Sequence, residues 1–130
     1  MVIGFSKQHG FREKILAGVK IHTIREDTTG RWAAGRKMHF AYGVRTKHYE
    51  CFKKDVCRAT QRIEIWYENK DSDFPIVTID GRPLFYGNEQ DFAVLWDLAI
   101  NDGFEDINAF CRWFNKDFTG KIIHWTEKLY

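Results

Sequence analysis

The sequence predicts an α+β domain with a small body of β-strands, one early helix, and a pair of helices before the last strand. Three observations predict it. Short segments of alternating apolar and polar residues recur over residues 1–86, two segments with helical spacing of apolar residues follow, and a strand-like segment comes last. A partly closed β-barrel with helices covering its ends would satisfy this order.

The first part of the chain alternates strands with one helix. We expect strands over 2–6 and 19–25, a helix between them over 8–18, a loop over 26–37, and a strand over 37–43. Gly18 is placed to end the helix, because glycine readily adopts the left-handed conformation that closes a helix.

The second part contains a hairpin and two helices. Residues 51–68 predict one or two strands, and residues 75–86 predict a hairpin whose two-residue turn is Asp80–Gly81. Pro83 has no backbone N–H to donate, so its strand is expected near a sheet edge. The chain then predicts helices over 90–102 and 105–118 and a final strand over 121–130.

The two later helices each carry an apolar stripe with three- and four-residue spacing. The stripes comprise Phe92, Leu95, Trp96 and Ala99 in the first helix and Ile107, Phe110, Cys111, Phe114 and Phe118 in the second. Most aromatic stripes of this kind pack in a core, so we expect burial here rather than a cofactor site.

Length and composition favour a single domain over residues 1–130. A chain of 130 residues with 44% hydrophobic and 16% aromatic content supplies a core and excludes intrinsic disorder. No run of about 18 apolar residues predicts a transmembrane helix, and the first residues lack the pattern of a signal peptide. We therefore expect a cytoplasmic protein without a membrane partner.

Cysteine and histidine usage argues against a metal site or a cofactor. The three cysteines are odd in number and none has C-x-x-C spacing, so neither a disulfide framework nor a spaced zinc site is expected. The five histidines are scattered along the chain. We expect no metal and no cofactor, and we expect Cys111 in the core.

The charge of the chain is divided between its halves. Residues 1–62 hold fourteen Lys and Arg against five Asp and Glu, a balance of +9, whereas residues 63–130 have a balance of −7. Such asymmetry is a weak pointer to a polyanionic partner such as RNA. The two halves neutralising each other in the folded protein is an equally good explanation.

The segment 20–25, KIHTIR, is unusually polar for a strand. Two isoleucines give it β-branched character, but Lys20, His22, Thr23 and Arg25 are costly choices for a segment that only fills a core. The segment is either a solvent-facing strand or the floor of a site.

Three stretches in order resemble the ASCH family of the PUA-like superfamily. They are FREKILAGVKIHTIR, with its Lys-x-x-Thr-x-Arg pattern, then IDGRPL, and then LAINDGFEDINAFCRWF followed by IIHWT. Together they cover nearly the whole chain. The resemblance implies a PUA-like small β-barrel whose cleft is lined by the first helix-to-strand segment and by the junction of the later helices.

The resemblance also implies a function. ASCH members are associated with RNA or modified-nucleoside recognition, and one bacterial branch hydrolyses N4-acetylcytidine with a Lys, a Thr three residues later, and a Glu. Carried onto this chain, the first two are Lys20 and Thr23, and the acidic position matches Asp102 best. Aspartate is one methylene shorter than glutamate, and a general acid must come within hydrogen-bond reach of its target.

The chemistry sets geometric conditions. A threonine nucleophile needs a base, and a lysine serves only if burial or a nearby cation such as Arg25 lowers its pKa. Residues three apart on a regular strand point to opposite faces, so Lys20 and Thr23 meet only if the chain turns or bulges at residues 19–21. A straight ladder with Lys20 pointing away from Thr23 would remove the shared site.

Each candidate has a structural alternative. Lys20 is also typical of a solvated edge strand, Thr23 of any strand, and Asp102 of a turn before glycine, while Arg25 could pair with an acid. The ordered match favours the site over these alternatives.

The loop GRWAAGRK supplies two further binding candidates. Arg31 is suited to a phosphate, and Trp32 either stacks on an unpaired base or folds back to seal the barrel. His22 is a weaker candidate for binding.

We therefore expect an RNA- or nucleoside-binding domain that hydrolyses N4-acetylcytidine or a related acylated nucleoside. Lys20, Thr23 and Asp102 are its candidate catalytic residues, and His22, Arg25, Arg31 and Trp32 its candidate binding residues. The alternatives are a non-catalytic RNA-binding module and, less favoured, a ribonuclease.

Overall fold

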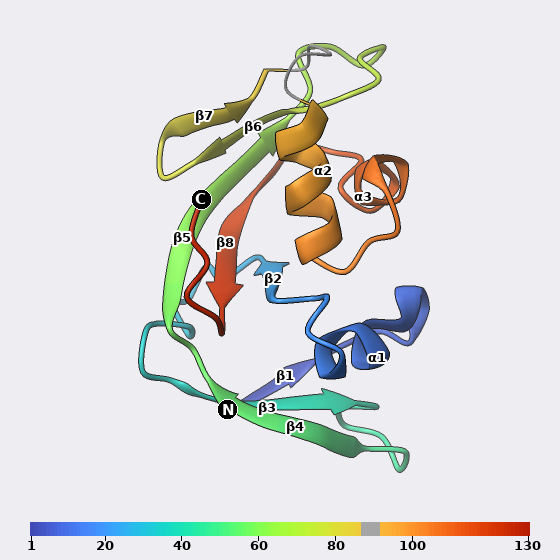
Figure 1. Cartoon of the computed structure of the whole chain (residues 1–130), viewed down its shortest axis with the longest axis vertical. Helices are drawn as coiled ribbons and strands as arrows, with labels where there is room; N and C mark the ends of the chain where they lie inside the picture. Colours follow the sequence, from blue (N-terminus) through green and yellow to red (C-terminus); the bar gives the residue numbers. More distant parts are fainter. Residues whose placement is uncertain (87–91) are drawn as a thin grey trace.

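The structure, a computed structural model, describes residues 1–86 and 92–130 and has the expected α+β architecture. In chain order its elements are β1 (Val2–Gly4), a 3₁₀ turn η1 (Gln8–Gly10), α1 (Phe11–Leu16), β2 (His22–Arg25), β3 (Lys37–Tyr42), β4 (Glu50–Val56), β5 (Ala59–Trp66), β6 (Ile76–Ile79), β7 (Arg82–Phe85), α2 (Phe92–Asn101), α3 (Ile107–Trp113) and β8 (Phe118–His124). The order of one early helix and a helical pair before the last strand is therefore confirmed (Figure 1).

The strands form two sheets. One sheet has the order β1-β3-β4, with β1 and β3 parallel, and the other has the order β2-β8-β5-β6-β7 with antiparallel pairs throughout. Figure 1 shows the three-stranded sheet at one end of the molecule and the five-stranded sheet extending away from it. Over residues 1–86 and 92–130 the hydrogen-bonded ladders do not close into a barrel.

A side chain, and not a neighbouring strand, binds the edge of β1 where the two sheets would have to pair to close a barrel. The Gly4 carbonyl, on the edge of β1 that faces away from β3, accepts a hydrogen bond of 2.6 Å from Arg25 Nη2 of β2. The two sheets are therefore joined here by a guanidinium and not by backbone pairing. At the other side the chain itself passes between the sheets, because Cys57 N–H donates to Arg36 while Arg58 N–H donates to His124.

The predicted hairpin is confirmed. Asp80 and Gly81 have φ values of 52° and 74°, the two left-handed residues that a type I′ turn requires. Pro83 lies in β7, at the edge of the five-stranded sheet, where its missing N–H breaks no ladder bond.

Several predicted boundaries were wrong. The predicted early helix over 8–18 is divided into a 3₁₀ turn and a six-residue helix, because His9 and Gly10 have positive φ. The six-residue helix ends at Leu16. Of the two alternatives for residues 51–68, two strands is confirmed, and the two belong to different sheets. Residues 90–91 of the next predicted helix lie outside the described residues.

Only part of each predicted apolar stripe is buried. Leu98 joins Leu95 and Ala99 on the buried face of α2, whereas Trp96 is 48% exposed. Cys111 is half-buried, because α3 presents it to a surface hollow described below. Phe118 begins β8 instead of ending α3.

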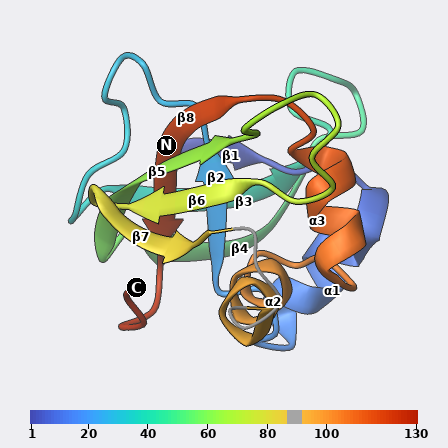
Figure 2. The ribbon, with the colours of Figure 1, turned by 90° about the horizontal axis from the view of Figure 1, so that it is seen from above.

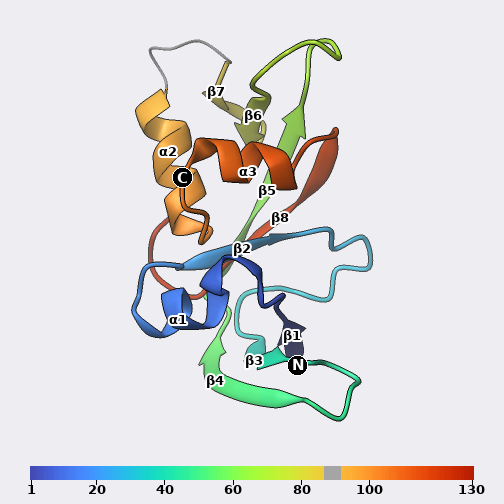
Figure 3. The same ribbon diagram turned by 90° about the vertical axis from the view of Figure 1, so that its right-hand side faces the viewer.

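The helices lie at one side of the sheets and frame the start of β2. In Figures 2 and 3, α2 and α3 cover one face of the five-stranded sheet, α1 lies beside the three-stranded sheet, and β2 runs between them. Four buried side chains lie there: Phe11 and Ile15 of α1, Phe104 between α2 and α3, and Phe110 of α3. No helix of the described ranges is long and apolar enough to cross a bilayer.

Candidate functional site

Lys20 lies in an irregular turn before β2. Gly18 has φ 77°, and the N–H groups of Val19 and Lys20 both donate to the carbonyl of Lys14, at 2.8 and 3.0 Å. The regular ladder of β2 with β8 begins only at His22. The predicted turn at residues 19–21 is therefore confirmed, and Lys20 is free of the strand alternation that would turn it away from Thr23.

The turn places Lys20 at the same cavity of about 150 Å³ as Thr23 and Arg25. Its polar lining includes Lys20, Thr23, Arg25 and Asp102, which come from the α1–β2 turn, from β2, and from the end of α2. Phenylalanine and tryptophan rings complete the wall: Phe5, Phe11, Phe104, Trp113 and Phe114.

The Lys20 ammonium is held inside the protein. The residue is 1% exposed, and its Nζ donates to the backbone carbonyl of Asp102 and lies 3.4 Å from the Asp102 carboxylate. Nζ also lies 4.7 Å from the centre of the Phe11 ring, within cation–π range. Burial lowers the pKa of Lys20 to about 8, because desolvation outweighs the attraction of Asp102.

Thr23 and Arg25 share one face of β2, as residues two apart on a strand do. Arg25 Nε donates to Thr23 Oγ1 at 3.2 Å, and the guanidinium carbon lies 4.9 Å from the centre of the Phe5 ring. Since the Thr23 oxygen accepts from Arg25, the hydroxyl proton is directed elsewhere. The Thr23 hydroxyl is therefore available to donate its proton to a group other than Arg25.

Asp102 is fixed at the end of α2. Its backbone N–H donates to Leu98 at 3.0 Å, and its side chain is buried. The carboxylate oxygen Oδ1 lies 3.1 Å from His22 Nδ1 and 3.4 Å from Lys20 Nζ. Asp102 therefore binds two nitrogens of the KIHTIR segment at once.

His22 does not line the cavity, contrary to its expected role in substrate binding. It is fully buried on the opposite face of β2, where Nε2 lies 2.6 Å from the Tyr130 hydroxyl. That hydroxyl is also 3.0 Å from Asn101 Nδ2. No pattern in the sequence points to Tyr130 or Asn101, because Tyr130 is 108 positions from His22 and has no motif around it.

The loop residues Arg31 and Trp32 line a second hollow of about 290 Å³, which shares Gly4 and Arg25 with the cavity. Trp32 is 5% exposed, so it packs in the core and leaves little of its ring for stacking. Arg31 is exposed. Of the two alternatives for Trp32, the structure favours packing against the body of the protein.

The described residues do not form a metal centre. They contain no group of three or more His, Cys, Asp or Glu side chains that could hold an ion. His124, the buried histidine beside His22, donates from Nε2 to Gln61 Oε1 at 3.0 Å, and its Nδ1 has no hydrogen-bond partner in the described structure.

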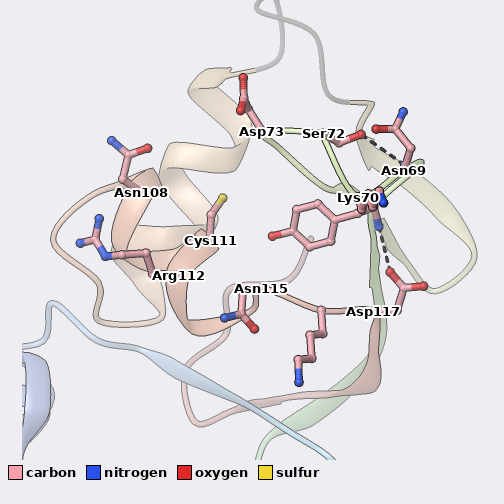
Figure 4. Close-up of a pocket in the computed structure, with 11 residues that line it drawn as sticks. Asn69, Lys70, Ser72, Asp73, Asn108, Cys111, Arg112, Asn115 and Asp117 are labelled. Atoms are coloured by element: carbon pink, nitrogen blue, oxygen red, sulfur yellow. Dashed lines mark hydrogen bonds between the residues drawn. The ribbon is translucent and has the colours of Figure 1, made fainter.

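A larger hollow of about 940 Å³ lies between the loop after β5 and α3, with no residue in common with the cavity (Figure 4). Tyr67 and Cys111 both line it, and Tyr67 Oη donates to the Phe114 carbonyl at 2.6 Å. Burial raises the pKa of Tyr67 to about 12 and that of Cys111 to about 11. Neither group is a nucleophile near pH 7, so the smaller cavity is the better candidate for chemistry.

Comparisons with protein-family models, with curated proteins and with solved structures gave no match to this chain.

Proposed function

We propose that this chain is an ASCH-type domain with an open, PUA-like body that binds a nucleobase in the Lys20 cavity and hydrolyses an N4-acylated cytidine there. One observation supports it above all others: Lys20, Thr23, Arg25 and Asp102, separated by up to 82 positions in the sequence, line one cavity. The resemblance of the sequence to the ASCH family supplies the substrate class.

The size of the cavity limits what enters it. About 150 Å³ corresponds to roughly five water molecules and is below the 300–1,000 Å³ usual for whole small-molecule ligands. The acylated edge of the base would occupy the cavity. The sugar and any phosphate would lie outside, across Arg25 in the hollow that Arg31 lines.

Neutral Lys20 is the proposed base and Thr23 the proposed nucleophile. The Thr23 oxygen attacks the acyl carbon, and its proton passes to Lys20 Nζ. The carbon–nitrogen bond then breaks, the leaving nitrogen takes that proton, and cytidine departs. Water repeats the sequence on the acyl-threonine ester, which releases the carboxylic acid and restores Thr23.

Arg25 is placed to assist the attack. Its Nε already contacts the Thr23 oxygen at 3.2 Å, and its positive charge helps to keep Lys20 neutral. A guanidinium beside the reacting centre also stabilises the negative oxygen that develops on the acyl carbon. Arg25 would therefore act on the transition state more than on the bound substrate.

Asp102 takes a different role from the proton donor that the resemblance implies. Its carboxylate oxygen already faces two nitrogens, so we assign it the orientation of Lys20. The proton for the leaving nitrogen then comes from Lys20 itself. A shorter acidic side chain fits this role, because it needs to reach Lys20 and not the substrate.

Incubation of pure protein with N4-acetylcytidine, followed by chromatography of released cytidine, tests the proposal. Thr23→Ser keeps the hydroxyl and should keep measurable activity, whereas Thr23→Val should lose at least 100-fold, the scale of a missing nucleophile or general base. Lys20→Met should lose as much. No release by the wild type, or full release by Thr23→Val, would refute the proposed reaction.

The pH dependence offers a second test of the same reaction. With a Lys20 pKa of about 8, about a tenth of the molecules hold the neutral amine at pH 7. The rate constant kcat/KM should therefore rise with pH and level off above pH 8. A rate that does not change between pH 6 and pH 9 would exclude Lys20 as the base.

A non-catalytic RNA-binding module is the second candidate. It is supported by the exposed Arg31 side chain, which lines the hollow beside Arg25 and makes no side-chain hydrogen bond or ion pair within the described residues. Affinity for a short single-stranded RNA should then fall steeply between 50 and 200 mM salt. Absence of RNA affinity at low salt would remove this candidate.

A further inference from the structure

We infer that Tyr130 and His22 form a positioning chain that fixes the tautomer of His22 and thereby directs the Asp102 carboxylate toward Lys20. The inference rests on the proposed function of the cavity, because the residue it serves is Lys20. Neither His22 nor Tyr130 lines the cavity, so both act through Asp102 and are positioning residues.

The chain is continuous, and its histidine and aspartate are buried. His22 Nε2 lies 2.6 Å from Tyr130 Oη, and His22 Nδ1 lies 3.1 Å from Asp102 Oδ1, the same oxygen that lies 3.4 Å from Lys20 Nζ. His22 is 0% exposed and Asp102 is 3% exposed. Solvent therefore has little access to replace the bond between His22 and Asp102.

The direction of each hydrogen bond follows from the acceptor at one end. As a carboxylate, Asp102 can only accept, so His22 Nδ1 must carry the proton that lies between them. A neutral imidazole has one N–H, so Nε2 is left as an acceptor. The Tyr130 hydroxyl then donates to Nε2 and accepts from Asn101 Nδ2 at 3.0 Å.

The opposite tautomer would leave two groups unsatisfied. If Nε2 carried the proton, the bare Nδ1 lone pair would face the Asp102 oxygen at 3.1 Å. The Tyr130 hydroxyl would accept from both Asn101 and His22 and would have no acceptor for its own proton among the bonds of the described structure. The hydroxyl of Tyr130 thus selects the tautomer that presents N–H to Asp102.

The other charged neighbours of His22 agree with a neutral ring. Besides Asp102 and Tyr130, the groups that act on it are Lys20, Asp97 and the ring of His124, which stands edge-on at 5.3 Å. Burial lowers the pKa of His22, and Lys20 lowers it further, against the two aspartates. Near pH 7 His22 therefore carries a single proton, on the Nδ1 that faces Asp102.

Imidazole ¹⁵N spectra of the folded full chain test this directly, with or without enzymatic activity. The wild type should show the Nδ1–H tautomer for His22, with Nε2 unprotonated at pH 7. In Tyr130→Phe, Nε2 loses its donor, so His22 should become protonated at a higher pH than in the wild type. Tyr49→Phe, which removes an exposed hydroxyl, should leave the His22 signals unchanged.

An Nε2–H tautomer in the wild type, or His22 signals that are the same in Tyr130→Phe, would overturn the inference. The hydrolysis assay adds a second readout. Tyr130→Phe should lower kcat on the order of tenfold, the usual scale for a group that orients a functional residue, with KM unchanged. A raised KM with unchanged kcat would contradict the positioning role.

The His22 substitutions separate the donor from the ring. His22→Asn can still offer an N–H near the position of Nδ1 and should retain more activity than His22→Leu, which offers none. Equal loss in both variants, at equal melting temperature, would contradict the role of the Nδ1 proton. If the wild type hydrolyses no acylated cytidine, the proposed reaction is refuted. The ¹⁵N spectra would still decide whether Tyr130 sets the tautomer of His22.

Discussion

Gly103 lies directly against the Lys20 side chain. A Cβ atom at Gly103 would stand 2.7 Å from Lys20 Cδ and 2.9 Å from Phe11 Cδ1, closer than real Cβ atoms approach other atoms. The φ of Gly103 is +98°, which disfavours any other residue. The glycine after Asp102 therefore makes room for the lysine that Asp102 holds.

Gly103→Ala is expected to displace Lys20 and to destabilise the protein. The positive φ costs about 1–2 kcal/mol for an L-residue, and crowding a packed core adds about 1–3 kcal/mol. Urea unfolding measures the sum, and the hydrolysis assay should show reduced kcat.

Gly18→Ala is the matched control for Gly103→Ala. Gly18 has φ +77°, but no atom lies within 4 Å of its Cβ position, so it carries the backbone penalty without the clash. Equal destabilisation of the two variants would contradict the close packing of Gly103 on Lys20.

Lys20 should make the stability depend on pH in the alkaline range. Its pKa is about 8 in the folded protein and 10.5 as a free side chain, so between these values the unfolded chain binds more protons and stability rises with pH. The gain is roughly 3 kcal/mol over that range. Denaturation of wild type and Lys20→Met at pH 7 and pH 10 isolates it from other titrating groups.

The stability difference between Lys20→Met and wild type should change with pH in one direction. Lys20→Met should be more stable relative to wild type at pH 7 than at pH 10, because at pH 7 the wild type carries a costly buried charge that methionine removes, whereas at pH 10 Lys20 is neutral. A stability difference that is independent of pH would mean that Lys20 is not desolvated as the structure indicates.

His124 should weaken the fold in acid. Burial and the neighbouring His22 lower its pKa to about 4 from 6.5, so the unfolded chain binds the extra proton first and stability falls as pH drops from 6.5 toward 4. The loss is roughly 3 kcal/mol. His124→Gln should show a flatter stability curve over that range than wild type, and an equally steep curve would contradict the assignment.

Arg25 and Arg31 should separate stability from binding. Arg25→Met loses the hydrogen bond to Gly4 that joins the two sheets and the hydrogen bond to Thr23 within β2, so we expect a loss of about 1–3 kcal/mol together with activity. Arg31→Met should leave the melting temperature unchanged, since the side chain is exposed. It should weaken binding of a cytidine that carries a phosphate while leaving cytidine binding intact. Equal effects of Arg31→Met on both ligands would exclude a phosphate contact.

The sequence predicted the elements well because their signals are local. Alternation identified the strands, Asp80–Gly81 identified the hairpin turn, and three- and four-residue spacing identified the helical pair. Boundaries were less accurate, because His9 and Gly10 break the early helix with backbone conformations that spacing does not reveal. Trp96 was expected to be buried and is half exposed, since the buried face of α2 is set by its packing partners.

The site was predictable only in part. The polarity of KIHTIR marked Lys20, Thr23 and Arg25, and the ordered resemblance added Asp102. His22 was expected beside the ligand, but strand alternation turns it to the opposite face. Trp32 had two open alternatives in the sequence, and a loop residue's direction is set by what the rest of the protein offers it to pack against.

By itself, the sequence determined the α+β class, the order of elements, and the residues able to do chemistry, because composition and periodicity are properties of short segments. Only the tertiary structure decided that Lys20 lies against Asp102, that Arg25 joins two sheets in place of a closed ladder, and that Tyr130 contacts His22. These contacts join residues 21 to 108 positions apart, and no local pattern encodes such a meeting.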